Sequence, residues 1–157
     1  MTERIITPPA RVAPVHLVAT EKLLGRDTGF YSLILIFEAK NIEPIEKAIA
    51  KVMPKKKGAR APISPLHYSK TIGYRLRLRS ESQVKAVNVT RKLIPLEYIL
   101  PGAIVRVQAT FVGREVVDGG VRACLGNIQL LRESSREVQE VDLGFDDIGE
   151  GWQHFYR

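Results

Sequence analysis

The sequence predicts a mainly β fold, arranged as a small closed or nearly closed barrel with one helix. Short apolar or alternating segments are separated by turn residues, and only one segment has a helical repeat. A parallel α/β sheet would need more crossover helices than the sequence offers. With 157 residues, the chain is long enough for one domain with a modest core.

Composition and the N-terminal residues exclude several classes of protein. Hydrophobic residues make up 45% and charged residues 26% of the chain, as in ordinary soluble domains. No apolar run approaches the roughly 18 residues of a membrane helix, and residues 1–14 lack the pattern of a signal peptide. The single Cys124 cannot form an internal disulfide, so we expect a reducing, cytoplasmic compartment.

Residues 12–20 and 30–38 predict the first two strands. The second segment, FYSLILIFE, is a nearly unbroken apolar run with the length of a buried strand. Pro14 lacks a backbone N–H and therefore predicts that the first strand lies at an edge of the sheet. Residues 22–29 contain two glycines and an aspartate, which predicts a connecting turn.

One helix is predicted to begin after Asn41 and to end before Pro54. Asn41 is expected to cap the helix through its side chain, and Pro44 is tolerated because it falls in the first turn. Apolar residues that recur at helical spacing predict the buried face: Ile42, Ile45, Ile49, Val52 and Met53.

Two hairpins are predicted after the helix. Residues 72–79 alternate between apolar residues and arginines, and residues 84–89 are expected to form the partner strand. The second hairpin spans residues 103–131 and turns at Asp118-Gly119-Gly120. Its return strand changes the phase of its apolar residues at Gly126, which predicts a β-bulge.

The sequence shows no pattern that is typical of an enzyme. Its three histidines, His16, His67 and His154, lack metal-ligand spacing, and no glycine-rich phosphate loop is present. Cys124 lies within an apolar strand and predicts a buried, inert thiol. Asp146-Asp147 is more typical of a solvated tail than of a metal site. We therefore expect no catalysis, no cofactor and no metal.

Charge is distributed unevenly along the chain. The formal net charge is +7, yet residues 133–157 hold seven acids against two arginines, and residues 40–92 hold 14 basic residues against three acids. A basic body suggests a domain that binds a polyanion, and the acidic end of the chain can compete with that polyanion for the basic surface. The alternative is a charged surface that only aids solubility, with a frayed end. We predict a nucleic-acid-binding domain over residues 1–132 and an acidic, aromatic-ended tail over residues 133–157.

The sharpest functional feature is the alternation of Arg75, Arg77 and Arg79 on one face of a predicted strand. Alternate residues recur every ~6.6–6.8 Å, which approximates the phosphate spacing of an extended single strand. A guanidinium group can also bind phosphate through two hydrogen bonds. A solvated outer face is the alternative, although such faces usually mix lysine, glutamate and threonine. If the first hairpin pairs as predicted, the same surface extends to Lys85, Arg91 and Lys92.

Two further elements suit a nucleic acid. A basic loop can fold over a bound strand or serve only solubility; its cations are Lys55, Lys56, Lys57 and Arg60. Tyr31 and Tyr68 can stack on bases, at about 1–3 kcal/mol for each base, or can pack in the core. Phe30 and Tyr98 are weaker candidates for stacking, and Tyr74 is expected to pack in the core.

Residues 101–133 resemble the C-terminal part of a family of small bacteriophage single-stranded-DNA-binding proteins. In that family a hairpin precedes a Gly-Leu-Asn-Asn-(Val/Ile)-Gln-like segment and an acidic tail, and here the segment reads Leu125-Gly126-Asn127-Ile128-Gln129. The resemblance covers most of residues 10–147. It implies an OB-fold-like five-stranded barrel with one α-helix and extended hairpins. It also implies a protein that coats single-stranded DNA during phage DNA replication and recombination in the host cytoplasm.

We therefore expect sequence-independent binding of single-stranded DNA, with a tail that engages replication or recombination proteins. The chain departs from the family in its arginine-rich middle strand and in its aromatic end. The tail residues singled out for partner contacts are Asp142, Asp146, Asp147, Trp152, Phe155 and Tyr156. Two rival functions stay open: a phage structural or assembly protein, and an RNA-binding or strand-annealing protein with the same barrel. Duplex binding and the oligomeric state also stay open.

Overall fold

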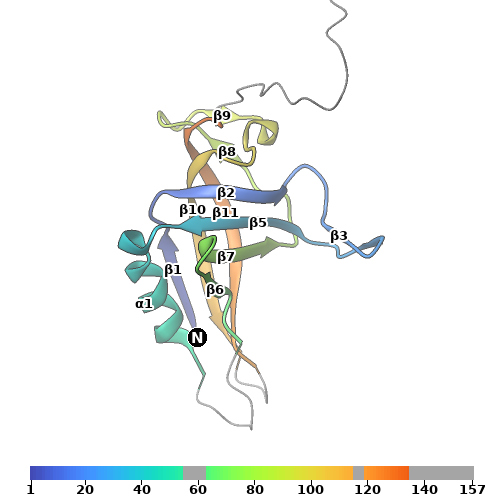
Figure 1. The fold of residues 1–157 in the computed structure, drawn as a ribbon. Helices are drawn as coiled ribbons and strands as arrows, with labels where there is room; N and C mark the ends of the chain where they lie inside the picture. Colours follow the sequence, from blue (N-terminus) through green and yellow to red (C-terminus); the bar gives the residue numbers. More distant parts are fainter. Residues whose placement is uncertain (55–62, 115–118, 135–157) are drawn as a thin grey trace, which may run out of the picture.

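The structure, a computed structural model, describes residues 1–54, 63–114 and 119–134 (Figure 1). It confirms the predicted fold class: the protein is mainly β, with a closed five-strand barrel and, among the described residues, one α-helix. The strands are β1 (Thr2–Ile6), β2 (Ala10–His16), β3 (Lys22–Leu23), β4 (Arg26–Asp27), β5 (Tyr31–Phe37), β6 (Leu66–Ser69), β7 (Gly73–Ser80), β8 (Ala86–Val87), β9 (Leu93–Ile94), β10 (Ile104–Gly113) and β11 (Val121–Arg132). The helices are α1 (Glu43–Val52) and two 3₁₀ turns, η1 (Ala39–Asn41) and η2 (Leu96–Tyr98).

Five of the strands close into the barrel. β2 pairs with β5, β5 with β7, and β10 with both β11 and β2, all antiparallel. The ring closes where β7 runs parallel to β11, at the pair Arg79–Cys124. In Figure 1, β2, β5 and β7 lie side by side, and β10 and β11 cross behind them. This arrangement is OB-fold-like, as the resemblance implied.

The barrel is filled by alternate residues of its strands. Leu33, Leu35 and Phe37 of β5 are fully buried, and Leu76 and Leu78 of β7 pack against them from the neighbouring strand. The intervening arginines of β7 therefore point outward, where charged side chains keep their hydration. The predicted alternation of β7 is confirmed.

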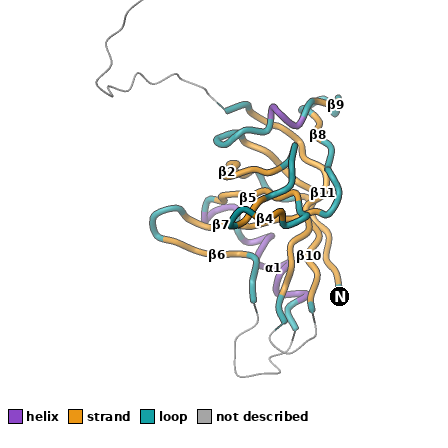
Figure 2. Tube along the Cα trace, turned by 90° about the vertical axis from the view of Figure 1, so that its right-hand side faces the viewer, coloured by secondary structure: helices purple, strands orange, loops and turns teal. Residues whose placement is uncertain are grey.

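The helix α1 packs against β1 and β10. In Figure 2 it lies beside β10. Its buried face matches the predicted spacing, but the predicted cap at Asn41 is wrong. Asn41 lies in the 3₁₀ turn η1, and the Ile42 carbonyl instead accepts hydrogen bonds from the amides of Ile45 and Glu46. Pro44 occupies the first turn, as predicted. None of the helices in the described part of the chain is long and apolar enough to cross a membrane.

The prediction that Pro14 places its strand at an edge is wrong. β2 lies between β10 and β5, and Pro14 falls in the register shift between Val12 and Val15. At this irregularity the β2–β5 ladder is interrupted, so a residue without an N–H is accommodated inside the sheet.

The predicted hairpin between β7 and the following strand is also wrong. β8 pairs with β9 and runs parallel to the later part of β11. Two polar side chains of β11 hold this segment. The Lys85 amide donates to Oδ1 of Asn127 at 3.1 Å, and Nε2 of Gln129 donates to the Asn88 carbonyl at 3.3 Å. These long-range bonds draw Lys85 away from β7.

The predicted bulge at Gly126 is confirmed. β10 and β11 pair at Val107–Ile128 and at Ala109–Leu125, so β11 has one extra residue between the two pairs. A Cβ atom at Gly126 would lie 2.7 Å from the Gln108 carbonyl oxygen. Glycine is therefore required where the two backbones approach closely.

Candidate nucleic-acid interface

A groove of about 530 Å³ lies over the outer face of β7. Its walls come from β5, β6, β7 and the start of β11, together with segments at residues 63–65 and 119–120. We call it the arginine groove, because five arginines line it: Arg75, Arg77, Arg79, Arg114 and Arg122. Such a concentration of cations at one concave surface creates a strong positive potential.

The register of β5 and β7 explains why three of these arginines share a face. Each pairs with an uncharged residue of β5: Arg75 with Ile36, Arg77 with Ile34, and Arg79 with Ser32. Directly paired residues project to the same side of an antiparallel sheet. The β5 side of the groove therefore supplies no acid to neutralise the arginines.

One acid nevertheless reaches the groove from a segment distant in sequence. Oε2 of Glu21 accepts a hydrogen bond from Nη2 of Arg77 at 2.7 Å. The Glu21 side chain is only 16% exposed, whereas that of Arg77 is 45% exposed. Burial raises the pKa of Glu21, but the hydrogen bond and the charge of Arg77 outweigh it and hold that pKa below its ordinary value. Arg77 is therefore already partly neutralised.

Arg79 contacts an aromatic ring at the end of the groove. Its guanidinium carbon lies 4.9 Å from the centre of the Phe30 ring, a cation–π distance. Burial and the neighbouring charges of Arg77 and Arg122 lower the pKa of Arg79. An arginine stays protonated in proteins, so this crowding of like charges favours an incoming anion.

Arg75 is exposed, as is Arg77, but no ion pair to Arg75 occurs within residues 1–54, 63–114 and 119–134. His67 of β6 pairs with it across the strands and also lines the groove.

The structure does not bring the two predicted stacking tyrosines into the arginine groove. Tyr68 is 64% exposed, and its ring centre lies 4.8 Å from that of Tyr74, opposite it on β7. Tyr74 is in phase with Leu76, so this pair lies on the face of β7 opposite to the arginines. Tyr31 is likewise in phase with Leu33 of the core. Phe30, the weaker candidate in the sequence, is the aromatic residue beside the arginines.

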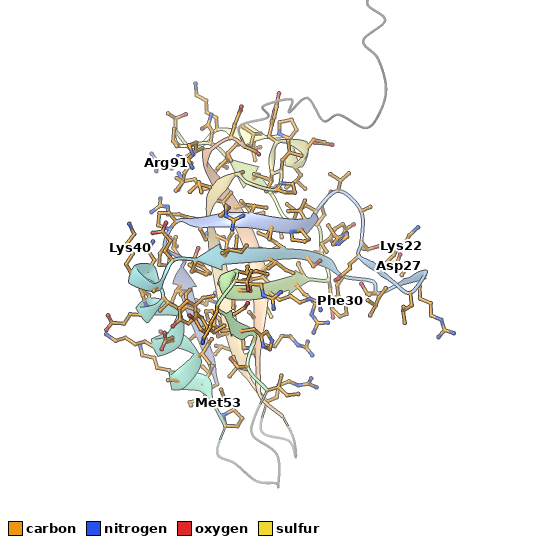
Figure 3. All side chains as sticks on the ribbon, in the orientation of Figure 1. Lys22, Asp27, Phe30, Lys40, Met53 and Arg91 are labelled. Carbon is orange, nitrogen blue, oxygen red and sulfur yellow. The ribbon has the colours of Figure 1, made fainter. Side chains whose placement is uncertain are left out.

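Lys85, Arg91 and Lys92 do not extend the arginine groove. They belong to the region of β8 and β9, which Figure 1 shows on the far side of β2 and β5 from β7. Figure 3 shows the same separation between the labelled Arg91 and Phe30. Several predicted site residues lie outside the described residues: Lys55, Lys56, Lys57, Arg60, Asp142, Asp146, Asp147, Trp152, Phe155 and Tyr156.

Sequence reasoning missed two arginines of the groove. The sequence pattern could have revealed Arg122, because this residue alternates with the apolar Val121 and Ala123 in a predicted strand. Arg114 directly follows β10, and its amide donates to the Gly120 carbonyl at 2.8 Å; no local pattern in the sequence shows that this places it in the groove. The contact of Glu21 with Arg77 was missed for the same reason, because the two residues are far apart in the sequence and only the fold brings them together.

Cys124 differs from its prediction. It lies on the outer phase of β11, half-buried and paired with Arg79, rather than in the apolar interior. Within the described ranges, no group of three or more histidine, cysteine, aspartate or glutamate side chains is placed to hold a metal ion.

No protein-family model matches the chain, and no curated protein matches it in sequence. Solved structures do match it. The single-stranded DNA-binding protein from bacteriophage Enc34, in complex with ssDNA, has a TM-score of 0.65 at 16% identity, over 82% of this chain and 86% of that one. The crystal structure of gp2.5, a single-stranded DNA-binding protein encoded by bacteriophage T7, has a TM-score of 0.60 at 13% identity, over 88% of this chain and 98% of that one. The resemblance found in the sequence is thus confirmed in three dimensions: the chain has the fold of these phage single-stranded DNA-binding proteins.

Proposed function

We propose that this protein binds single-stranded DNA without sequence preference, through the arginine groove. The observation that carries the proposal is the alignment of Arg75, Arg77 and Arg79 along one strand, with Arg114 and Arg122 beside them. Neutralising phosphates with arginine releases counterions, which supplies most of the free energy of non-specific binding.

The chemistry of the groove argues for non-specific binding. Guanidinium contacts to phosphate position a strand but carry no sequence information, whereas specificity needs contacts to base edges. Phe30 offers a ring for stacking, which every base can use. An open strand that exposes both its phosphates and its bases fits this combination better than a duplex does.

The structural neighbours support the same partner, because their names describe single-stranded DNA binding. We extend the proposal to phage DNA replication or recombination, where single strands are exposed. The acidic tail over residues 133–157 would then contact other proteins of that process.

A set of titrations tests the proposal. Fluorescence anisotropy would compare oligo(dT), mixed-sequence DNA, duplex DNA and RNA of equal length at several salt concentrations. We expect similar affinities for the two single-stranded DNAs, weaker duplex binding, and affinities that fall steeply as salt rises. A preference for duplex DNA would contradict the proposal.

The rival functions are distinct outcomes of the same experiment. Tighter binding to RNA, or rapid annealing of complementary strands, would favour the RNA-binding or strand-annealing alternative. Stable large assemblies that bind no oligo(dT) even at low salt would favour the structural alternative.

A further inference from the structure

A second groove lies at the end of β5 that is farther from Phe30. It has a volume of about 870 Å³, and its walls come from the start of β2, the end of β5, the turn η1 and residues of β6, β7, β10 and β11. In Figure 3, the labelled Phe30 and Lys40 lie near opposite ends of β5, and Lys40 lines this groove. We call it the end groove. It adjoins the arginine groove, because Ile36 of its wall pairs with Arg75.

One row of paired residues joins the two grooves across the barrel. From β7 to β11, the row consists of Arg75, Ile36, Arg11, Ile104 and Arg132, each paired directly with the next. Directly paired residues project to the same side of an antiparallel sheet, so the whole row lies on the outer face of the barrel, with Arg75. An arginine thus occurs on every second strand, and the row contains no acid.

The two arginines of the end groove are available to an anion. Arg11 and Arg132 are exposed, and neither forms an ion pair in the part of the chain that the structure describes. Glu38 is the one acid among the described residues of the wall, and it is paired with Lys40 at 3.3 Å. A phosphate that reaches Arg11 or Arg132 therefore does not have to displace a carboxylate.

The spacing of the row suits a single strand. Neighbouring strands of a sheet lie ~4.8 Å apart, so the arginines of the row recur every ~9.6 Å. Alternate residues of a β-strand, ~6.6–6.8 Å apart, approximate one phosphate interval, so each arginine can meet every first or second phosphate. The distance from Arg75 to Arg132 is four strand spacings, ~19 Å, which is enough for about three further nucleotides.

The wall of the end groove also offers apolar surface. Tyr68 is 64% exposed and Ile72 is 42% exposed, and both line the groove. Cations beside exposed rings and apolar side chains match the phosphates and the unpaired bases of a single strand. An acidic protein segment is the other candidate occupant. The unbroken row that leads from the arginine groove favours the strand.

We propose that a bound single strand turns at Arg75 and continues across the outer face of β5, β2 and β10 into the end groove, with phosphates on Arg11 and Arg132. This inference rests on the proposed function, since it requires a strand in the arginine groove. It extends the contact from two strands of the barrel to all five, and it sets the length of DNA that one chain covers.

The test is the double variant R11Q/R132Q in the full chain. Both side chains are exposed, so the melting temperature should be unchanged. The variant R11K/R132K keeps the charge at both positions. The matched control is K85Q/K92Q, which removes two exposed cations from the region of β8 and β9.

Anisotropy titrations over a salt series use oligo(dT) of about 4 and about 12 nucleotides, which lie within the range of site sizes of one OB-like barrel. Each lost phosphate contact to a single strand lowers the salt slope by about 0.7. For the longer oligomer, R11Q/R132Q should therefore lower the slope by about 1.4 and weaken binding about tenfold. The shorter oligomer should bind this variant as it binds the wild type, because the arginine groove alone holds it. R11K/R132K should keep the wild-type slope, and K85Q/K92Q should match the wild type on both oligomers.

Three results would overturn the inference. They are wild-type binding of the longer oligomer by R11Q/R132Q, equal losses on the two oligomers, and an equal loss in K85Q/K92Q. A peptide with the sequence of residues 135–157 is titrated as well. If it binds the wild type but not R11Q/R132Q, while the longer oligomer binds both equally, the end groove takes an acidic protein segment and the inference is wrong. Failure of the proposed function is distinct, since the wild type would then bind neither oligomer.

Discussion

At the scale of single residues, Glu21 decides how many arginines are free to bind phosphate. Its carboxylate occupies Arg77 at 2.7 Å, as a phosphate oxygen would. The sequence showed the spacing of the arginines but not this partner, because Glu21 and Arg77 are brought together only when β5 pairs with β7. Local alternation predicts which face a side chain takes, whereas an ion pair between distant segments depends on the completed fold.

The substitution E21Q should strengthen DNA binding. It removes the charge that competes with phosphate for Arg77, so affinity should rise several-fold and the salt slope should steepen by about 0.7, the value for one added contact to a single strand. Anisotropy titrations over a salt series measure both quantities. The control is E38Q, which removes a carboxylate that pairs with Lys40 at 3.3 Å on an exposed surface outside the groove. Equal effects of E21Q and E38Q would show that only net charge matters.

Glu21 should also make folding stability depend on pH. Because its pKa is lowered in the folded state, its ion pair stabilises the protein fully above the unfolded value of about 4.3, and this stabilisation is lost as pH falls through the folded value. Urea unfolding at a series of pH values from 7 downward measures the free energy of unfolding of the wild type and of E21Q. The difference in favour of the wild type should shrink below about pH 4.5. An advantage that is constant across this range would contradict the assignment.

At the scale of elements, β11 organises the barrel. Its phase change, visible in the sequence, correctly placed the bulge at Gly126. Its polar residues Asn127 and Gln129 capture the segment around β8, which the sequence wrongly placed beside β7. A strand of two residues has too little periodicity to show its own partner, so the pairing of β8 could not be read locally.

The substitution G126A tests the close approach in the bulge. A methyl group there would lie 2.7 Å from a carbonyl oxygen and 2.9 Å from the Cβ of Gln108, so we expect a destabilisation of about 1–3 kcal/mol. Chemical denaturation measures the change. DNA affinity of the folded fraction should be unaffected, because Gly126 does not line the groove. An unchanged midpoint would show that the backbone relaxes and that the bulge does not require glycine.

At the scale of the whole molecule, charge separates the body from the end of the chain. The last strand, β11, ends at Arg132, and the division into a body and a tail at residue 133 stays a prediction. The short alternating segments predicted a small closed barrel, whereas the number of five strands came from the resemblance to the phage family. The groove was only half predictable, because its second wall comes from the end of β10 and the start of β11.

Deleting residues 133–157 should tighten DNA binding and steepen its salt dependence. The deletion removes seven acids and two arginines, which we expect to compete with DNA for the basic surface. Titration of the truncated and full chains with oligo(dT) measures the difference. Equal affinities of the two chains at low salt would contradict competition between the tail and DNA.

The most direct test of the central claim compares two triple variants with the same loss of charge. R75Q/R77Q/R79Q removes the cations of β7, and K85Q/R91Q/K92Q removes three cations from the region of β8 and β9. Oligo(dT) titrations over a salt series should show the salt slope falling by about 1.4 for the first variant, the value for the contacts of Arg75 and Arg79, because Glu21 holds Arg77 in the wild type. The slope should change little for the second variant. Equal losses in the two variants, or a greater loss in the second, would contradict binding through the arginine groove.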